Sequence, residues 1–260
     1  MVRWLVVLIL AGAVGAVACG GDDDGGSEGA ASGTSTPVVV TPNTSRAAAT
    51  PGAGASEGNL FVNPGLEEGD TGWTSLQPDA SFVVSTERAQ GGSSSALLRM
   101  RDPAEAGGIK VYYLVQEISP ELWPDEISGA YRVENWAPGS EIQYVQFVVV
   151  AFGPSNMPDE YTNWQIRYPL AGLDEPPYQL ENARFQFLGS GQPRTGEWIQ
   201  FRTNIREDFE RAWGVVPENF EKIRVLFEVR WEEKVPGAPA SADVYYDDLY
   251  IGPGELVAAP

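Results

Sequence analysis

Carboxylate and aromatic side chains are the groups in this sequence that can do chemistry. The 260 residues include 36 Asp and Glu, 17 Lys and Arg, 8 Trp and 10 Tyr, but no His and a single Cys. Without histidine, Ser-His-Asp and Cys-His catalysis and histidine-ligated metals are excluded, and one cysteine cannot form an internal disulfide. The formal net charge of −19 argues against a nucleic-acid partner, which would require a basic face. Carboxylate chemistry, calcium binding and aromatic stacking remain.

Aromatic and polar side chains alternate in several strand-like runs and form a candidate ligand site. In the run 163–170, Trp164 and Tyr168 share one face, while Arg167 lies on the other. If these runs are neighbours in one sheet, their polar faces line a concave groove with aromatic walls, which suits a sugar. The candidate ligand-binding residues are Tyr112, Gln116, Trp164, Arg167, Tyr168, Glu228 and Arg230, with Tyr178 as a further aromatic candidate. In the alternative, the aromatics are core residues and the Arg and Glu side chains pair across strands.

A series of short strands must position these side chains. The predicted strands are Ser81–Thr86, Ala96–Arg101, Lys110–Ile118, Ile127–Asn135, Ile142–Phe152, Asn163–Leu170, Ala183–Leu188, Trp198–Asn204, Ile223–Trp231 and Asp243–Ile251. In the run 223–231, apolar residues alternate with Glu228 and Arg230, which is typical of a strand with one buried face. One helix is predicted at Arg206–Trp213. This pattern predicts an all-β fold, a two-sheet antiparallel β-sandwich (jelly roll) with one short helix.

The N-terminal residues predict a targeting signal and a linker. The apolar run Trp4–Val17 ends in Ala16-Val-Ala-Cys19, which resembles the lipobox of bacterial lipoproteins. We therefore expect a lipoprotein signal peptide over residues 1–18, lipidation of Cys19, and a disordered Gly/Ala/Ser/Thr/Pro linker over residues 19–58. An ordinary signal peptide with an incidental cysteine is the alternative. The expected product is a monomer that is lipid-anchored to the cell membrane and faces the extracytoplasmic side.

Five segments of the remaining chain resemble a known family in their order and spacing. They are Asn59–Gly69, Thr71–Trp73, Gly91–Arg99, Ile127–Arg132 and Asp243–Ile251. Together they resemble the galactose-binding-like jelly rolls, especially carbohydrate-binding modules of the family 4/9 type. The resemblance covers residues 59–254 and leaves 255–260 as a short tail, although Leu66 stands where the family usually has phenylalanine.

Two acidic residues in the end motifs are candidate metal ligands. Strand alternation places Asp247 on the side of Leu249 and Ile251, and a carboxylate in line with core side chains needs a partner. The family resemblance implies a structural calcium ion at Glu67 and Asp247, where carboxylates and loop carbonyls form an oxygen-rich site. In the alternative, Glu67 caps turn amides and Asp247 accepts backbone hydrogen bonds without a metal.

The resemblance implies non-catalytic binding of a glycan or polysaccharide. The sequence has no histidine, so a Ser nucleophile of the G-x-S-x-G type would lack its base, and we do not expect an enzyme. One alternative is a structural or protein-interaction jelly-roll domain without a sugar ligand. A glycoside hydrolase that uses a carboxylate pair is the other.

Overall fold

Ten strands and one α-helix form the part of the chain that the structure describes, residues 57–158 and 160–254 of a computed structural model. The strands are β1 (Phe82–Ser85), β2 (Ser95–Asp102), β3 (Gly108–Ile118), β4 (Glu126–Ala137), β5 (Ile142–Phe152), β6 (Asn163–Ala171), β7 (Ala183–Phe185), β8 (Trp198–Asn204), β9 (Lys222–Lys234) and β10 (Ala240–Gly252). The helix α1 is Ile205–Trp213, and a short 3-10 turn, Pro78–Ala80, precedes β1. Every predicted strand and the predicted helix are therefore confirmed, with small differences at their ends.

The predicted signal peptide, Cys19 and nearly all of the predicted linker lie outside the described residues, as does the tail 255–260. Among the residues that are described, no helix has the length and apolar character needed to span a membrane.

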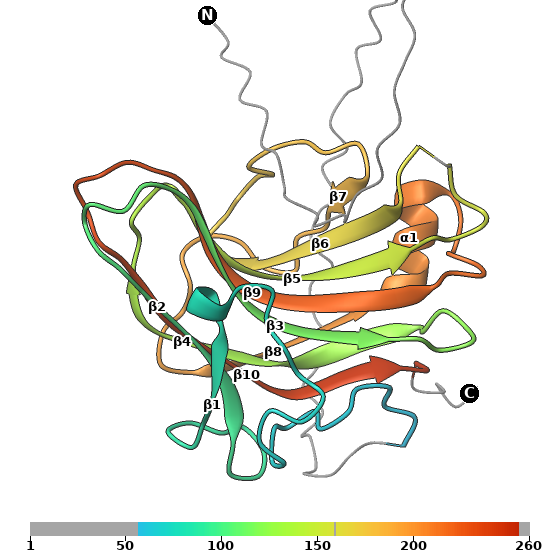
Figure 1. The fold of residues 1–260 in the computed structure, drawn as a ribbon, viewed down its shortest axis with the longest axis horizontal. Coiled ribbons are helices and arrows are strands. Elements are labelled where there is room, and N and C mark those ends of the chain that lie inside the picture. Colours follow the sequence, from blue (N-terminus) through green and yellow to red (C-terminus); the bar gives the residue numbers. More distant parts are fainter. Residues whose placement is uncertain (1–56, 159, 255–260) are drawn as a thin grey trace, which may run out of the picture. The chain divides into compact units, whose positions relative to one another are not determined.

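The strands form two five-stranded sheets that pack face to face as a jelly-roll sandwich (Figure 1). The first sheet has the order β1-β2-β10-β4-β8, and the second has the order β3-β9-β5-β6-β7. All neighbouring pairs are antiparallel except β6 and β7, which run parallel and differ in this respect from the fully antiparallel prediction. Chain neighbours such as β2 and β3 lie in different sheets, so the chain crosses between the sheets repeatedly.

The core lies between the inner faces of the two sheets. Along β9, Ile223, Val225, Phe227 and Val229 are fully buried, as the alternation of this run predicts. The ring of Phe227 lies 5.1 Å from that of Tyr246 on β10, which joins the two sheets across the core. Tyr246 also donates its hydroxyl to backbone carbonyls of the second sheet, at Gln146 and Glu228.

A β-bulge in β10 gives Asp247 an orientation that differs from the predicted one. The register between β10 and β4 shifts between Asp247 and Tyr250, and Asp248 has the left-handed φ of 50°. The bulge turns Leu249 into the core, whereas Asp247 lies on the outer face of the first sheet. The prediction that Asp247 shares a face with Leu249 and Ile251 is wrong, because simple alternation fails where an extra residue is inserted.

Helix α1 closes one end of the sandwich and begins at a side-chain cap. The side chain of Asn204 accepts the N–H of Glu207, and Gly214 ends the helix at a φ of 77°. Phe209 is fully buried, and its ring packs 4.6 Å from that of Trp123. The helix thus covers the core edge beside β6 and β8.

Candidate functional site

The outer face of the second sheet carries an unusual group of buried polar side chains. Residues that are paired across antiparallel strands point to the same face, and the register pairs Tyr113 and Gln146 with Glu228, and Tyr144 with Arg230. We call this surface the polar face, and it consists of Tyr113, Tyr144, Gln146, Gln165, Arg167, Tyr178, Glu228, Arg230 and Glu232. It brings together Arg167, Glu228 and Arg230 from the predicted ligand-binding set.

Arg230 is the centre of the polar face. Its guanidinium forms ion pairs with Glu228 at 3.2 Å and with Glu232 at 2.7 Å, and its side chain is 8% exposed. Burial by itself lowers the pKa of Arg230, but the neighbouring Tyr144, Tyr178 and the two carboxylates hold that pKa above its ordinary range. Arg230 therefore stays charged in a largely desolvated position.

Two neighbouring side chains complete this network. Tyr144 donates its hydroxyl to Glu232 at 2.7 Å, and burial keeps the pKa of this tyrosine well above its ordinary value. Gln146 donates Nε2–H to Glu228 Oε2 at 2.6 Å, the same oxygen that accepts from Arg230. Gln146 and Arg230 therefore both donate to the same carboxylate oxygen, Glu228 Oε2.

One acceptor and one donor of this network have no hydrogen-bond partner. Within the described part of the chain, Gln146 Oε1 and Arg230 Nε are buried and unsatisfied. Buried polar atoms are nearly always hydrogen-bonded in proteins, and an unmet bond of this kind is destabilising by about 1–3 kcal/mol. The network around Glu228 therefore contains one unsatisfied acceptor, Gln146 Oε1, and one unsatisfied donor, Arg230 Nε.

Arg167 lies at the β6 side of the polar face without a carboxylate partner among the described residues. Its Nε and Nη2 donate to Gln165 Oε1, and its Nη1 donates to the hydroxyl of Tyr178 at 3.0 Å. The guanidinium also lies 5.8 Å from the Tyr178 ring. Tyr113, Gln165 and Tyr178 are half-buried, and they form the accessible part of this face.

The other four predicted ligand-binding residues lie on the opposite, inner face of the second sheet. Tyr112 is paired with Val229, and Gln116 with Val225, so both point toward the core. Gln116 binds the backbone of Val62, accepting from its N–H and donating to its carbonyl. The prediction that these residues share a groove with Glu228 and Arg230 is wrong. Tyr112 and Gln116 are paired with inward-facing residues of β9, whereas Glu228 and Arg230 point to the outer face.

Trp164 and Tyr168 are core residues as well. Trp164 is 4% exposed and packs 4.5 Å from the ring of Trp213, while Tyr168 is fully buried and donates to Asp208 at 3.1 Å. Sequence reasoning missed Tyr113, Tyr144, Gln146 and Glu232 on the polar face. The one available signal was the presence of two glutamines, Gln143 and Gln146, in the mostly apolar run 142–152.

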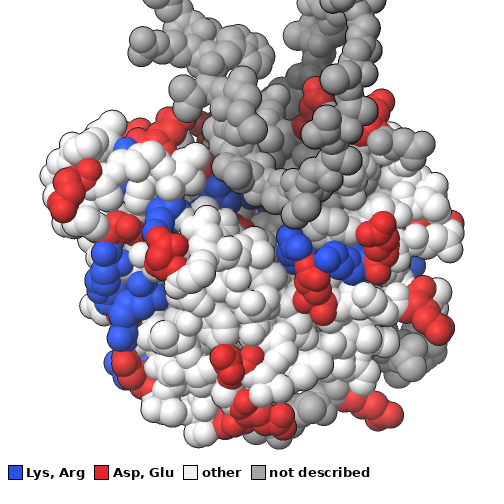
Figure 2. All heavy atoms as spheres, viewed as in Figure 1, with Lys and Arg blue, Asp and Glu red and all other residues white. Residues whose placement is uncertain are grey.

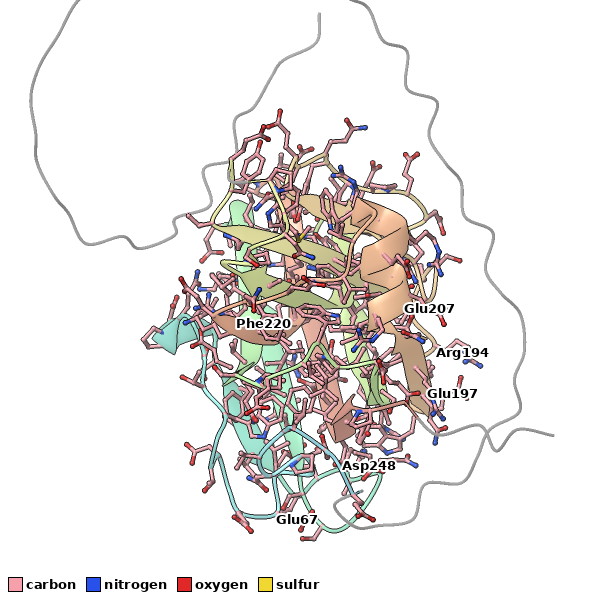
Figure 3. The ribbon with its side chains drawn as sticks, turned by 90° about the vertical axis from the view of Figure 1, so that its right-hand side faces the viewer. Glu67, Arg194, Glu197, Glu207, Phe220 and Asp248 are labelled. Carbon is pink, nitrogen blue, oxygen red and sulfur yellow. The ribbon has the colours of Figure 1, made fainter. Side chains whose placement is uncertain are left out.

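Glu67 and Asp247 lie near the loop that precedes β2. Glu67 accepts the N–H groups of Ser93 and Ser94 and the hydroxyl of Ser93, and the pKa of Glu67 is lowered chiefly by that hydroxyl. Figure 3 shows Glu67 and Asp248 at the same end of the sandwich, and the charge of Glu67 adds to burial in raising the pKa of Asp248.

The surroundings of Asp247 consist of N–H donors. Its carboxylate accepts from the backbone N–H groups of Gln90, Gly91 and Asp248, and burial raises its pKa to about 7. No group of three or more Asp, Glu, Cys or His among the described residues could hold a metal ion. This arrangement corresponds to the amide-capping alternative of the sequence analysis and does not fit the oxygen-rich shell that calcium requires. Calcium at Glu67 and Asp247 stays a prediction from the family resemblance.

Charges on the visible surface are mixed. In Figure 2, Lys and Arg side chains lie beside Asp and Glu side chains rather than in a broad basic field. Glu117, for example, pairs with both Lys222 and Arg224 at the β3–β9 edge of the polar face.

Comparisons with known proteins return similar folds at low identity. No family model matches the chain, and no curated protein matches it. A structure of TmCBM61 in complex with β-1,4-galactotriose is 12% identical, with a TM-score of 0.41, and the match covers 74% of this chain and 97% of that one.

Two further solved structures are also carbohydrate-binding modules. The CBM22-1 xylan-binding domain from Paenibacillus barcinonensis Xyn10C is 15% identical, with a TM-score of 0.41 and coverage of 76% and 97%. A non-crystalline cellulose-specific module, CBM28, is 14% identical, with a TM-score of 0.36 and coverage of 74% and 93%. Because these TM-scores lie below 0.5, we base the fold on its own strand order and the function on the side chains of this chain.

Proposed function

We propose that this domain is a non-catalytic carbohydrate-binding module that holds a glycan against the polar face. The observation that carries the proposal is the unsatisfied pair of Gln146 Oε1 and Arg230 Nε. Both atoms are buried in the unliganded domain, so the proposal includes a shift of the half-buried Tyr113 and Tyr178 that lets sugar hydroxyls in. There the amide oxygen accepts from a hydroxyl and the guanidinium N–H donates to one. A hydrocarbon ligand could satisfy neither atom.

The half-buried tyrosines of the polar face support the same ligand class. Tyr113 and Tyr178 offer aromatic surface beside the charged network, and their hydroxyls add polar contacts. Ligand sites commonly combine such apolar surface with a few fixed polar groups.

The carboxylates of the polar face support binding rather than catalysis. Glu228 and Glu232 are both engaged by Arg230, and each accepts one further hydrogen bond from the side chain of Gln146 or Tyr144. A glycosidase needs two carboxyl groups that flank the scissile bond in separate roles. Here both carboxylates hold Arg230 in place.

We also propose that the domain is displayed on the extracytoplasmic side of a cell membrane by lipidation of Cys19. The apolar run and the Ala-Val-Ala-Cys19 motif support this proposal. Growth with a radiolabelled fatty acid tests it. We expect label in the wild-type protein and none after Cys19→Ser, and label that persists in the variant would contradict the assignment.

Polysaccharide binding tests the main proposal. A soluble chain that starts after Cys19 is incubated with insoluble or gel-embedded neutral polysaccharides, and the bound fraction is measured. Arg230→Lys keeps the charge between Glu228 and Glu232 but removes the Nε–H donor. Hydrogen bonds to charged groups contribute about 1.5–3 kcal/mol, so we expect binding to weaken by about 10–150-fold.

Arg224→Lys is the matched control, because Arg224 lies on the same face of β9 but is paired with Glu117. We expect it to bind like the wild type, and melting curves show whether both variants fold. Failure of the wild-type chain to bind any polysaccharide would refute the proposal and favour a protein-interaction domain.

A further inference from the structure

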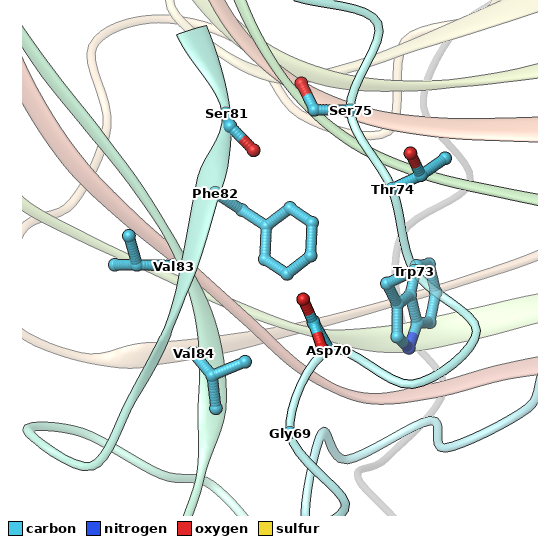
Figure 4. Close-up of a pocket in the computed structure, with 9 residues that line it drawn as sticks. All are labelled: Gly69, Asp70, Trp73, Thr74, Ser75, Ser81, Phe82, Val83 and Val84. Carbon is cyan, nitrogen blue, oxygen red and sulfur yellow. The ribbon is translucent and has the colours of Figure 1, made fainter. Parts of the chain in front are cut away.

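A cavity lies beside β1, at the edge of the sandwich where β1 approaches β3. Its volume is about 580 Å³, and we call it the β1 pocket. It is lined by Gly69, Asp70, Trp73, Thr74, Ser75, Ser81, Phe82, Val83 and Val84 (Figure 4). Pockets that bind small ligands have volumes of about 300–1,000 Å³, so its size suits a sugar residue.

The pocket exists because the edges of the two sheets diverge here. Thr74 forms a bridge with Val115 of β3, which adds its segment to the second sheet. Ser81, directly before β1, also bridges β3, at Tyr113, and only from Phe82 onward does the chain pair with β2 at the edge of the first sheet. The space beyond Ser81, between β1 and the segment of Thr74, is open.

One side of the β1 pocket is aromatic and aliphatic. The half-buried ring of Phe82 lies toward the middle of the pocket, as Figure 4 shows. Val83 and Val84 are 53% and 37% exposed at its rim. Trp73 lies 6% exposed at its base and is fixed there by donating its indole N–H to the Asn63 carbonyl. This side therefore presents apolar surface on a rigid support.

The other side carries polar groups that are free to bind a ligand. Among the described residues, the carboxylate of Asp70 and the hydroxyls of Thr74 and Ser81 form no hydrogen bond or ion pair. Ser75, in contrast, donates its hydroxyl to the carbonyl of Gln77 or Ala80, and so shapes the wall. The carboxylate of Asp70 thus lies beside the ring of Phe82, with the hydroxyl of Ser81 next to it on the same strand (Figure 4).

We propose that the β1 pocket is a second sugar-binding site, which takes a neutral pyranose residue. A pyranose has an apolar C–H face that can pack on Phe82, and hydroxyls at its edge that can donate to Asp70. The carboxylate and the net charge of −19 disfavour a uronic acid or a phosphorylated sugar, because like charges repel. This site uses no residue of the polar face, so it does not depend on the function proposed there.

Saturation-transfer and titration NMR with methyl β-glucopyranoside and methyl β-galactopyranoside test this site, with glucuronate as the charged counterpart. The soluble chain that starts after Cys19 is used. We expect binding in the millimolar range to at least one neutral glycoside and no binding of glucuronate. Stronger binding of glucuronate, or no binding of either neutral glycoside, would overturn the proposal.

Variants place the bound sugar in this pocket. We expect Asp70→Asn and Phe82→Leu each to weaken glycoside binding by about tenfold or more, since each removes one polar or aromatic contact. Glu68→Gln makes the same charge change two residues away, outside the pocket lining, and is expected to bind like the wild type. Melting curves confirm that each variant folds.

A polar-face variant, Tyr178→Ala, separates the two sites. We expect it to leave glycoside binding in the β1 pocket unchanged. If Tyr178→Ala abolishes glycoside binding while Asp70→Asn and Phe82→Leu do not, the β1 pocket is not a sugar site and the function proposed for the polar face stands. If the pocket variants alone lose binding, the β1 pocket is a sugar site whatever the polar face does.

Discussion

Replacing Asp208 should destabilise the domain strongly, although this residue lies in a helix at the edge of the sandwich. Asp208 is 2% exposed and accepts hydrogen bonds from Tyr168 at 3.1 Å, Thr203 at 2.7 Å, Gln186 at 2.7 Å and Arg211 at 2.8 Å. Burial and the charge of Asp208 together raise the pKa of Tyr168 well above its ordinary value, so the tyrosine is a hydrogen-bond donor at neutral pH. The carboxylate therefore joins α1 to β6 and β8.

The size of the effect follows from the donors that Asp208→Ala leaves without an acceptor. The hydroxyl of Tyr168 is fully buried, and leaving it unsatisfied is destabilising by about 1–3 kcal/mol. The half-buried Thr203 and Gln186 each lose a bond that contributes about 1 kcal/mol, whereas the exposed Arg211 can turn to water. We expect the free energy of unfolding to fall by about 3–5 kcal/mol, a large part of the roughly 5–15 kcal/mol of a typical domain.

A double-mutant cycle tests this reasoning. Tyr168→Phe removes the buried hydroxyl and is expected to lower the free energy of unfolding by about 1 kcal/mol on its own. In the Asp208→Ala background it should be neutral or stabilising, because no unsatisfied hydroxyl remains, which gives a coupling of about 1–2 kcal/mol. Urea unfolding followed by tryptophan fluorescence measures all four proteins.

Two results would refute the account of Asp208. One is a loss below about 1 kcal/mol for Asp208→Ala, which is the size expected at an exposed site. The other is simple additivity in the cycle. Polysaccharide binding gives an independent check, because Tyr168→Phe should leave it unchanged if Tyr168 is a core residue rather than a ligand-binding one.

Two further predictions concern Glu67 and Asp247. If the predicted calcium ion is bound there, excess EDTA lowers the melting temperature and added calcium restores it; an unchanged curve means that the two carboxylates serve only as acceptors of N–H and O–H groups. The pKa of Glu67 is lowered in the folded state, so its hydrogen bonds to Ser93 and Ser94 stabilise the fold above the ordinary carboxyl pKa, and this contribution disappears as the pH falls through the lowered value. The melting temperature of Glu67→Gln should therefore fall less steeply than that of the wild type as the pH is lowered into the acid range. Equal slopes for the variant and the wild type would contradict this role.

Local sequence patterns determined most of the secondary structure. The alternation along β9 identified which of its residues face the core, and the strands on either side of the Gly/Pro-rich turns were confirmed. The helix was evident from its residues 206–213 and from Gly214, which adopts the left-handed conformation at its end. These features depend on interactions within a few residues, which a sequence shows directly.

The relation between strands that are distant in the chain was decided only by the tertiary structure. Tyr112 is the predicted ligand-binding residue of this strand, but the register of β3 against β9 turns Tyr113 to the polar face and Tyr112 to the core. A shift of one residue would exchange them, because side chains alternate with a period of two. The bulge at Asp248 likewise places the side chain of Asp247 on the face opposite to the one that simple alternation predicts.

The sequence by itself thus determined the strands, the sandwich and the kinds of side chain available for binding. Only the packed structure decided which side chains lie together: Gln146 and Arg230 around Glu228 on the polar face, and Asp70 and Phe82 in the lining of the β1 pocket. The physical reason is that periodicity is a local property of the chain. Register, bulges and the gap between sheet edges arise from contacts between residues that are far apart in sequence.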